Sequence, residues 1–451
     1  MKNLYTSLIS GAVFPLHEKL KGHTTVSVKK AMECSQWWSV EQLEQSRLQR
    51  LREFLSQVYA HVPYYRSLFD EIGFDVLSVK SVTDIQQLPF LDKKIIRENQ
   101  QDLKADNATQ LSQFNTGGSS GEPLVFFIGD SRVSHDVAAK WRATRWWDVD
   151  IGDKEIVLWG SPIELGAQDR FRLLRDRLFR STLLPAFEMS EAHLNEFIAA
   201  IRSIRPRMLF GYPSVQAHIA QHAENNGLSL DDLGIKVAFV TSERLYPEQR
   251  EEIERSFGCR VANGYGGRDA GFIAHECPEG GMHITAEDII VEIVDPQGNV
   301  VPDGESGEVV ITHLFTDDFP FIRYRTGDVA SLSTETCSCG RGLPMLKEIH
   351  GRTTDFIIAV DGTVMHGLAL IYVLREIEEI KSFKIVQETL EWTRVEVVGD
   401  RHFSDQHVAR IISGFKQRLG ESVNIEVEEV DDIKPERSGK YRYVISKVAM
   451  T

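Results

Sequence analysis

The sequence is short of cysteine, of positive charge and of long apolar runs. Its 451 residues include five cysteines, an odd and low number that argues against a disulfide framework and favours a reducing compartment. An apolar run near the N-terminus, residues 8–16, is interrupted by Ser10, Gly11 and Pro15 and carries no small-residue cleavage site. We therefore expect a cytoplasmic protein with no membrane span, in which this run docks on the folded domain.

Positive charge is in deficit: 51 Lys and Arg stand against 66 Asp and Glu, a net charge of −15. The averaged field repels phosphate backbones and anionic lipid surfaces, so we expect no nucleic-acid partner. A local site for a small anion such as ATP is compatible with this charge, because backbone N–H groups and one or two cations outweigh a distant, screened field. With 42% hydrophobic residues and 33 glycines, the chain has the composition of a folded globular protein.

Hydrophobic periodicity predicts a large α/β domain over residues 1–350, with mixed sheets and helices. Apolar residues at three- and four-residue steps predict a helix over 40–70, and further helices are expected at 191–204 and 214–226. Between them, apolar runs predict strands at 124–128, 155–160, 207–212, 237–242, 261–266, 289–294 and 307–314. This alternation favours a largely parallel sheet with a later antiparallel portion, and ligands collect at the carboxyl ends of such strands.

The last hundred residues change character and predict a small, mobile α+β domain over 351–451. Strands at 384–390 and 394–400 precede a helix at 404–420 and a further strand at 423–430. The domain boundary is expected near Gly351.

One Gly/Ser-rich segment, Asn115 to Pro123, has the composition of a phosphate cradle. Its glycines let backbone N–H groups turn around a tetrahedral anion, and Thr116, Ser119 and Ser120 add hydroxyl donors. It is not a Walker loop, because Glu122 stands where that loop has lysine. The alternative is a plain flexible surface loop.

Four further segments carry glycine beside polar or aromatic residues. In Asn263 to Asp269, an aromatic ring between glycines can stack on a purine and the acid can hold Mg²⁺. In Tyr324 to Asp328, a carboxylate after a glycine can accept from ribose hydroxyls. The last two are Gly351 to Asp355 and Pro435 to Lys440. Taken singly, each is more often a turn.

In this order, the five segments resemble the adenylate-forming superfamily of acyl-CoA synthetases, adenylation domains and luciferases. Within it, the chain is most similar to the phenylacetate-CoA ligase family, including its capsular polysaccharide biosynthesis branch. The resemblance extends from about residue 50 to the C-terminus.

The resemblance implies a role for each matching position. The loop from Thr116 to Gly121 would hold the β- and γ-phosphates of ATP, Tyr265 would lie on adenine, and Asp328 would bind the ribose. The turn Ser242 to Arg244 would line the adenine and acyl pockets. The implied nucleotide-site residues are Thr116, Gly117, Gly118, Ser119, Ser120, Gly121, Ser242, Glu243, Arg244, Gly264, Tyr265, Gly266, Asp328 and Arg352.

Three residues have implied catalytic roles. Asp269 would take the place of the family's acidic Mg²⁺ ligand, although many members have Thr-Glu where this chain has Arg268-Asp269. Lys440 would bridge the substrate carboxylate and the α-phosphate. Arg352, near the hinge, would reach the nucleotide, although many members have Asp where Thr354 stands.

The implied function is ATP-dependent activation of a carboxylic acid through an acyl-adenylate, followed by transfer to a thiol, as in an aryl- or acyl-CoA ligase. The expected small molecules are ATP, Mg²⁺, the acid and CoA. A carrier protein, amine or hydroxyl as acceptor is the first alternative, and a nucleotide-binding protein without turnover is the second. The oligomeric state stays open, with a homodimer as one option.

Two cysteine-containing turns predict a structural zinc site. Cys277 and His283 lie six residues apart across a Pro/Gly turn, and Cys337 and Cys339 lie in another Gly turn. A Cys₃His set is the ligand chemistry of structural Zn²⁺. His275 competes with His283 as the fourth ligand, and the alternatives are four reduced side chains or a redox pair between Cys337 and Cys339.

Aromatic residues at strand ends suggest a wall for a flat or aryl acid. They occur in Trp159 to Pro162 and in Phe210 to Ser214. Such residues belong to the core more often than to a substrate wall. The remaining tryptophans assigned to packing are Trp37, Trp38, Trp146 and Trp147.

Overall fold

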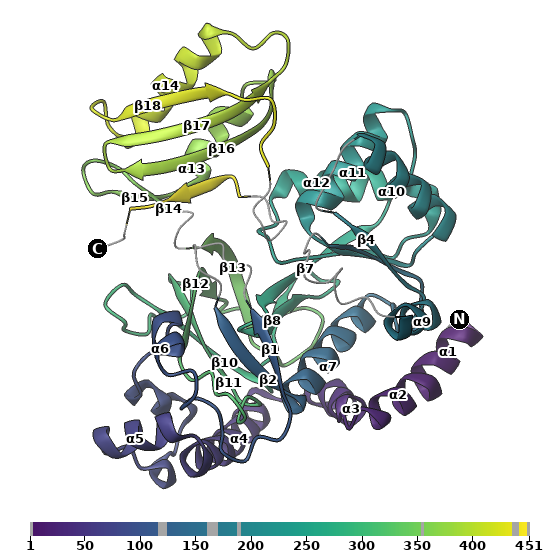
Figure 1. The fold of residues 1–451 in the computed structure, drawn as a ribbon, viewed down its shortest axis with the longest axis vertical. Coiled ribbons are helices and arrows are strands. Elements are labelled where there is room, and N and C mark those ends of the chain that lie inside the picture. The colour runs from purple at the N-terminus through teal and green to yellow at the C-terminus, as the bar shows by residue number, and fades with distance from the viewer. Residues whose placement is uncertain are drawn as a thin grey trace.

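A computed structural model describes residues 3–115, 124–159, 170–186, 191–352, 356–434 and 442–448. Figure 1 shows a large unit built around one long sheet, and a smaller unit containing β16 to β18 and α14 at one end of it. The predicted α/β class, with a small α+β unit at the C-terminus, is confirmed.

The N-terminal part of the chain is helical. Helix α4 (Val40–His61) begins at Ser39, whose hydroxyl accepts from the Gln42 N–H while the Gln42 side chain accepts from the Ser39 N–H. Pro63 starts α5 (Pro63–Ile72), so the helix predicted over 40–70 is two helices. The other helical segments here are α1 (Leu4–Leu8), the π-turn η1 (Ile9–Val13), α2 (Phe14–Leu20), α3 (Thr25–Ser35), η2 (Val76–Ser78), η3 (Val82–Gln87) and α6 (Lys93–Glu98).

An 11-stranded sheet runs through the large unit in the order β10-β11-β12-β13-β9-β8-β7-β6-β5-β3-β4. Its strands are β3 (Glu155–Trp159), β4 (Ser181–Pro185), β5 (Met208–Gly211), β6 (Val237–Thr241), β7 (Arg260–Gly267), β8 (Gly271–Glu276), β9 (Met282–Ile284), β10 (Ile289–Val294), β11 (Ser306–His313), β12 (Tyr324–Leu332) and β13 (Met345–Arg352). Neighbours from β4 to β7 are parallel, and those from β7 to β10 are antiparallel. The antiparallel portion is therefore larger than expected and continuous with the parallel one.

The parallel strands alternate with helices, as expected. The helices are α7 (Asp130–Trp146), α9 (Arg170–Phe179), α10 (Glu191–Ile204), α11 (Pro213–Asn225) and α12 (Pro247–Phe257), with the short η4 (Asp231–Leu233). One strand prediction was placed wrongly: residues 124–128 do not join the sheet. They belong to β2 (Val125–Gly129), which pairs with β1 (Leu111–Asn115) in a separate hairpin.

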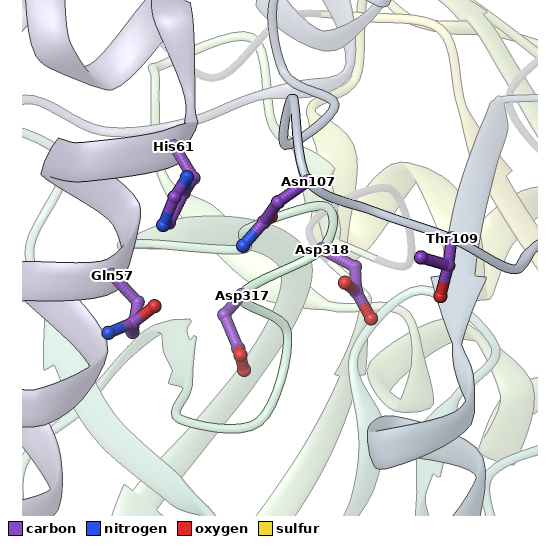
Figure 2. A pocket seen from close by; sticks show the side chains of 6 residues that line it. All are labelled: Gln57, His61, Asn107, Thr109, Asp317 and Asp318. Carbon is purple, nitrogen blue, oxygen red and sulfur yellow. The ribbon is translucent and has the colours of Figure 1, made fainter.

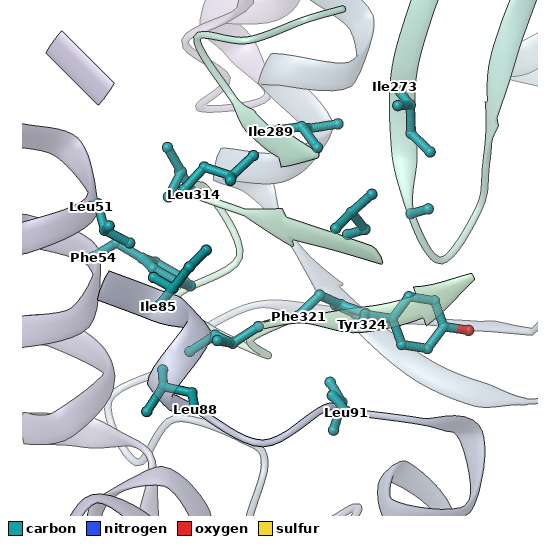
Figure 3. Packing of buried hydrophobic residues seen from close by; sticks show 14 of the residues in the cluster. Leu51, Phe54, Ile85, Leu88, Leu91, Ile273, Ile289, Leu314, Phe321 and Tyr324 are labelled. Atoms are coloured by element: carbon teal, nitrogen blue, oxygen red, sulfur yellow. The ribbon is translucent and has the colours of Figure 1, made fainter. Parts of the chain in front are cut away.

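The main core joins the N-terminal helices to the antiparallel part of the sheet. Figure 3 shows Leu51 and Phe54 of α4 in the same cluster as Leu314 and Phe321. Tyr324, at the start of β12, lies in this cluster with its ring buried. The core thus fixes the end of β12 from which the candidate site is built.

The C-terminal unit has a four-stranded sheet, β18-β17-β16-β19, and its core also takes in Tyr246 of the large unit. Its elements are β14 (Phe356–Ile358), β15 (Val364–His366), α13 (Leu368–Arg375), β16 (Ile380–Thr389), β17 (Trp392–Gly399), α14 (Asp405–Leu419), β18 (Asn424–Glu429) and β19 (Val444–Ser446). The expected strand, strand, helix, strand order is present, while β14, β15, α13 and β19 are additional.

Candidate nucleotide and metal sites

The loop after β6 lies beside the glycine-aromatic segment of β7. Thr241 and Gly264 are partners in the parallel register of these strands. Ser242 follows with φ 72°, a left-handed conformation that is strained for a residue with a side chain and is often found at functional sites. At Gly264 a Cβ would stand 2.7 Å from Cε1 of Phe239, so the close approach of the strands requires glycine.

Tyr265 joins β7 to β12. Its hydroxyl donates a hydrogen bond to Oδ2 of Asp328 at 3.0 Å. On the next strand, the Cα of Arg352 is the register partner of the Cα of Asp328. Two residues with implied adenine and ribose roles are therefore in contact, and the backbone of a third lies opposite them.

The segment Ser242 to Arg244 connects this group to two other elements. The Arg244 guanidinium donates to the His350 carbonyl on β13 at 2.5 Å. The Glu243 carboxylate accepts from the Ser214 N–H in the first turn of α11 at 3.3 Å. The structure thus brings together the described nucleotide-site residues from four separate parts of the sequence.

Asp269 lies in the turn between β7 and β8, and its Oδ2 accepts from the Tyr324 hydroxyl at 2.7 Å. The hairpin is tight, since a Cβ on Gly266 would stand 2.2 Å from the Gly271 carbonyl oxygen. Tyr324 is the first residue of the Y-R-T-G-D segment, and Asp328 is the last. The segment therefore contains one acid of the site, Asp328, and binds the other, Asp269, through the Tyr324 hydroxyl.

A buried arginine on α7 contacts the β7–β8 hairpin. Arg132 on α7 is 1% exposed, and its Nη2 donates to the Arg268 carbonyl at 2.7 Å. Its Nε lies 3.4 Å from Oδ2 of Asp136, one turn along the helix. Burial alone would raise the pKa of Asp136, but the Arg132 charge and His313 outweigh it, so the pKa is lowered and the carboxylate stays ionised.

The sequence analysis did not identify this Arg132 and Asp136 pair. Its four-residue spacing on a helix was the available signal, but that spacing is typical of solvated ion pairs. Only the fold shows that the pair lies beneath the hairpin that carries Asp269.

Several residues with implied roles lie outside the described residues: Thr116, Gly117, Gly118, Ser119, Ser120, Gly121 and Lys440. The described chain stops at Asn115, the last residue of β1, and resumes at Leu124, just before β2. For Arg352 only the backbone is described.

The predicted metal ligands form one cluster: the ligand atoms of Cys277, His283, Cys337 and Cys339 all lie within 4.8 Å of one another. The sulfurs of Cys277 and Cys337 are 3.6 Å apart, and the Cys339 sulfur is 3.2 Å from Nε2 of His283. Tetrahedral Zn²⁺ with Zn–S bonds of about 2.3 Å places neighbouring sulfurs about 3.8 Å apart. The cluster has the composition and nearly the dimensions of a structural zinc site.

The surroundings fix the ligands. The other ring nitrogen of His283, Nδ1, lies 3.2 Å from the Leu343 carbonyl oxygen, which holds Nε2 toward the cysteines. A Cβ on Gly281 would stand 2.7 Å from the Cys337 sulfur, so this position has room for glycine alone. Burial lowers the pKa of His283 to about 4 and keeps its imidazole neutral, as a metal ligand requires.

Cys277 and Cys339 differ in their surroundings. Burial raises the pKa of the Cys277 thiol to about 12. Burial also acts to raise the pKa of Cys339, but hydrogen bonds from Arg341 outweigh it and the pKa is lowered. A cation at the centre would be needed to ionise Cys277.

His275, the alternative fourth ligand, is the register partner of His283 on β8 but does not belong to the cluster. Its ring stacks on Phe272 with centroids 5.4 Å apart, and neither ring nitrogen has a hydrogen-bond partner among the described residues. Burial lowers its pKa to about 3. His283 is therefore the histidine that the geometry favours.

The aromatic residues expected near an acyl pocket are largely packed into the core. Tyr212 is 1% exposed, and its ring centroid lies 4.6 Å from that of Trp159. Phe210 is also buried, whereas Gly160, Ser161 and Pro162 lie outside the described residues. Of the tryptophans assigned to packing, two were assigned wrongly: Trp37 is 53% exposed, with the Arg341 guanidinium over its ring, and Trp38 is 37% exposed.

A small cavity of about 80 Å³ lies away from these sites (Figure 2). It is lined by Gln57 and His61 from α4, by Asn107 and Thr109 before β1, and by Asp317 and Asp318. None of the residues predicted for the nucleotide or metal site lines it.

Comparisons with known proteins find similarity in both units of the chain. Residues 180–314 match the model of the AMP-binding enzyme family, and residues 357–447 match the CapK C-terminal domain. The chain is 24% identical to Protein CapK of Staphylococcus aureus over 460 aligned residues, which cover 99% of this chain and 97% of that protein. The chain is thus similar to AMP-binding enzymes in its large unit and to CapK over nearly its whole length.

Its relatives also include phenylacetate-coenzyme A ligases. It is 25% identical to the phenylacetate-coenzyme A ligase of Thermus thermophilus, covering 90% of this chain and 96% of that enzyme. Its fold is that of 2-hydroxyisobutyryl-CoA ligase in the postadenylation state, with a TM-score of 0.73, 22% identity and 91% coverage of each chain.

Proposed function

We propose that this protein is an ATP-dependent ligase that activates a carboxylic acid as its acyl-adenylate and then transfers the acyl group to the thiol of CoA. The observation that carries the proposal is the contact of Tyr265 with Asp328. It brings together the segment that would bind adenine and the segment that would bind the ribose. The match of residues 180–314 to AMP-binding enzymes, and the alignment of 90% of this chain with a phenylacetate-coenzyme A ligase, support the same reaction.

The nucleotide would be positioned by β7 and β12. The Tyr265 ring would cover adenine, and its hydroxyl would orient the Asp328 carboxylate toward the ribose hydroxyls. The strained Ser242 and the Arg244 bond to β13 would hold the neighbouring loop in a fixed place, so that little ordering is needed on binding.

The chemical step requires charge neutralisation, because a carboxylate attacks the α-phosphorus of ATP and pyrophosphate leaves. Lys440 and the N–H groups of residues 116–121 are proposed to provide part of the positive charge. Asp269, oriented by the Tyr324 hydroxyl, would hold Mg²⁺, which would neutralise phosphate charge when bound.

The thioester step would follow a movement of the C-terminal domain, proposed to comprise residues 351–451 and to carry Lys440. Apart from Tyr246, its core consists of its own residues, so such a movement would break few buried contacts. The thiolate of CoA would attack the acyl carbon, and AMP would leave.

The Cys₃His cluster is proposed to hold a structural zinc ion. Four protein ligands leave no open position for water, so the metal would stabilise the two loops and take no part in the chemistry. The five free thiols fit a reducing compartment, and we place the protein in the cytoplasm on that ground.

The test is pyrophosphate release from ATP across a panel of aryl, aliphatic and amino acids, each with and without CoA. One acid that gives release, with turnover raised by CoA, supports the ligase and identifies its substrate. Pyrophosphate release that no acid stimulates contradicts it.

A second candidate keeps the adenylation step and changes the acceptor to a carrier protein, an amine or a hydroxyl. It is favoured by the match of residues 357–447 to the CapK C-terminal domain, since this unit would face the acceptor. In the same panel, it predicts acid-dependent release that CoA leaves unchanged.

A further inference from the structure

The outer face of the N-terminal helical segment is apolar although it faces solvent. The inner side chains of Ile9 and Phe14 are buried against Ile151. The opposite side carries four exposed leucines: Leu4 (88%), Leu8 (57%), Leu16 (59%) and Leu20 (80%). A helix that is apolar on both sides has one face without a partner among the described residues.

The π-turn η1 keeps these leucines near one another around the helix axis. In a regular α-helix, residues 4 and 20 would differ in direction by about 160°. The extra residue of the π-turn, Ile9–Val13, reduces this difference to about 60°. The leucines therefore lie along one side of α1 and α2.

Helix α9 extends this apolar surface. The Tyr5 hydroxyl donates to the Leu178 carbonyl at 2.8 Å, and the rings of Phe14 and Phe179 are 5.9 Å apart, so α9 packs directly on α1 and α2. Three further leucines are exposed on α9: Leu173, Leu174 and Leu178. We name these seven exposed leucines of α1, α2 and α9 the leucine face.

The charge around the leucine face is opposite to that of the whole chain. Residues 3–24 and 170–180 together contain seven Lys and Arg but two acids, in a protein of net charge −15. One acid, Glu18, is buried and accepts from the Thr25 hydroxyl at 2.5 Å. The other, Asp176, is paired with Arg175. Two acids of other elements lie beside it: Asp153, which accepts from the Thr6 hydroxyl, and Asp130, 3.8 Å from His23. Seven Lys and Arg thus stand against four acids, so the region keeps a basic excess.

We propose that the leucine face binds an anionic lipid membrane, with α1, α2 and α9 lying in the plane of the interface. Exposed leucines beside lysine and arginine are the composition of interfacial helices. Charges beyond a Debye length of about 8 Å are screened, so the local basic surface decides the attraction and not the net charge. No helix in the described part of the chain is long and apolar enough to cross a membrane.

The test is co-sedimentation of the full chain with phosphatidylcholine vesicles with and without phosphatidylglycerol. The unmodified protein should bind the anionic vesicles, more weakly at high salt, and should not bind the neutral vesicles. Leu8→Glu combined with Leu174→Glu should lower the vesicle affinity about tenfold or more, because two inserted leucines are lost. Leu77→Glu, at an 85% exposed leucine on η2, is the matched control and should bind normally.

Two further readouts keep the test decisive. The double variant must retain acid-dependent ATP–pyrophosphate exchange, since neither leucine belongs to the nucleotide site. Equal binding to neutral vesicles, no binding to either kind, or equal loss with Leu77→Glu would overturn the proposal. So would light scattering that shows a dimer which the double variant dissociates, because the leucine face would then be a contact between two copies.

Discussion

The Tyr265 hydroxyl donates to the Asp328 carboxylate at 3.0 Å across 63 residues of sequence. This bond joins a glycine-aromatic turn on β7 to a carboxylate on β12, two features that are weak signals when taken separately. The Asp269 carboxylate and Tyr324 hydroxyl form a second such bond between the same two segments, at 2.7 Å. Two crossed tyrosine–aspartate pairs therefore define the candidate nucleotide site.

Removing the phenol at position 265 should weaken ATP binding. Tyr265→Phe keeps the ring over adenine but removes the donor to a charged carboxylate, a bond of about 1.5–3 kcal/mol. We expect kcat/KM for ATP to fall about tenfold or more, mainly through KM, and Asp328→Asn to have a larger effect. Tyr372→Phe, at a half-exposed tyrosine on α13, is the control. A normal KM for ATP in Tyr265→Phe would contradict the assigned contact.

The Arg132 and Asp136 pair should be coupled in stability. Arg132→Met leaves the partly buried Asp136 carboxylate without its main counter-charge and should cost about 2–3 kcal/mol in the free energy of unfolding. The double variant Arg132→Met with Asp136→Asn should be more stable than Arg132→Met alone by about half of that loss. Urea denaturation measures both free energies of unfolding. The exposed Arg410 and Glu376 pair is the matched control, and its cycle should show coupling below about 1 kcal/mol. Purely additive losses at Arg132 and Asp136 would contradict the coupling.

Zinc content should separate the two histidines. His283→Ala or Cys339→Ser should lose stoichiometric zinc and lower Tm, because a ligand is removed from a closed site. His275→Phe should retain zinc, since its ring lies against Phe272 and outside the cluster. The measurement is elemental analysis of the purified variants. Unmodified protein without zinc, or loss of zinc in His275→Phe alone, would refute the assignment.

Glu252 on α12 should make stability depend on pH. Burial, with a contribution from Glu224, raises the pKa of this carboxyl to about 7 from its ordinary value of 4.5. The folded state then holds its proton more tightly than the unfolded state, so this group's stabilisation is complete below pH 4.5 and is lost as the pH rises through 7.

Glu252→Gln should therefore stabilise the protein at pH 8, by about 1 kcal/mol after allowance for its partial exposure, and change little at pH 4. Urea denaturation at both pH values measures this. Glu251→Gln, at the exposed neighbour on the same helix, is the control. An equal gain from Glu252→Gln at both pH values would contradict the raised pKa.

Elements with a clear apolar period were predictable from the sequence, whereas the shortest strands and the long strands β12 and β13 were missed. Helix α10 was placed at its observed bounds, because Leu194, Phe197, Ile198 and Ile201 mark a buried face. Strands β14, β15 and β19 were missed, since three residues show no period. The strand at 124–128 was assigned to the wrong sheet because strand patterns do not specify a pairing partner.

The candidate site, too, was predictable only in part from the sequence. The residues from Ser242 to Asp328 were found through the order of their segments, and the structure supplies their contacts. Arg132 was missed, because nothing local distinguishes a buried helical ion pair from a solvated one. The choice between His275 and His283 also required the fold, since both stand within a few residues of Cys277.

The most direct test of the central claim follows the oxygen atoms of the acid. When the accepted acid carries ¹⁸O in its carboxylate, attack on the α-phosphorus and later attack of the thiol on the acyl carbon leave one ¹⁸O on the released AMP. We predict AMP that is heavier by one ¹⁸O in mass spectrometry, with unlabelled pyrophosphate, and no labelled AMP from Lys440→Ala. Unlabelled AMP, or label in the pyrophosphate or in inorganic phosphate, would contradict adenylation as the activating step.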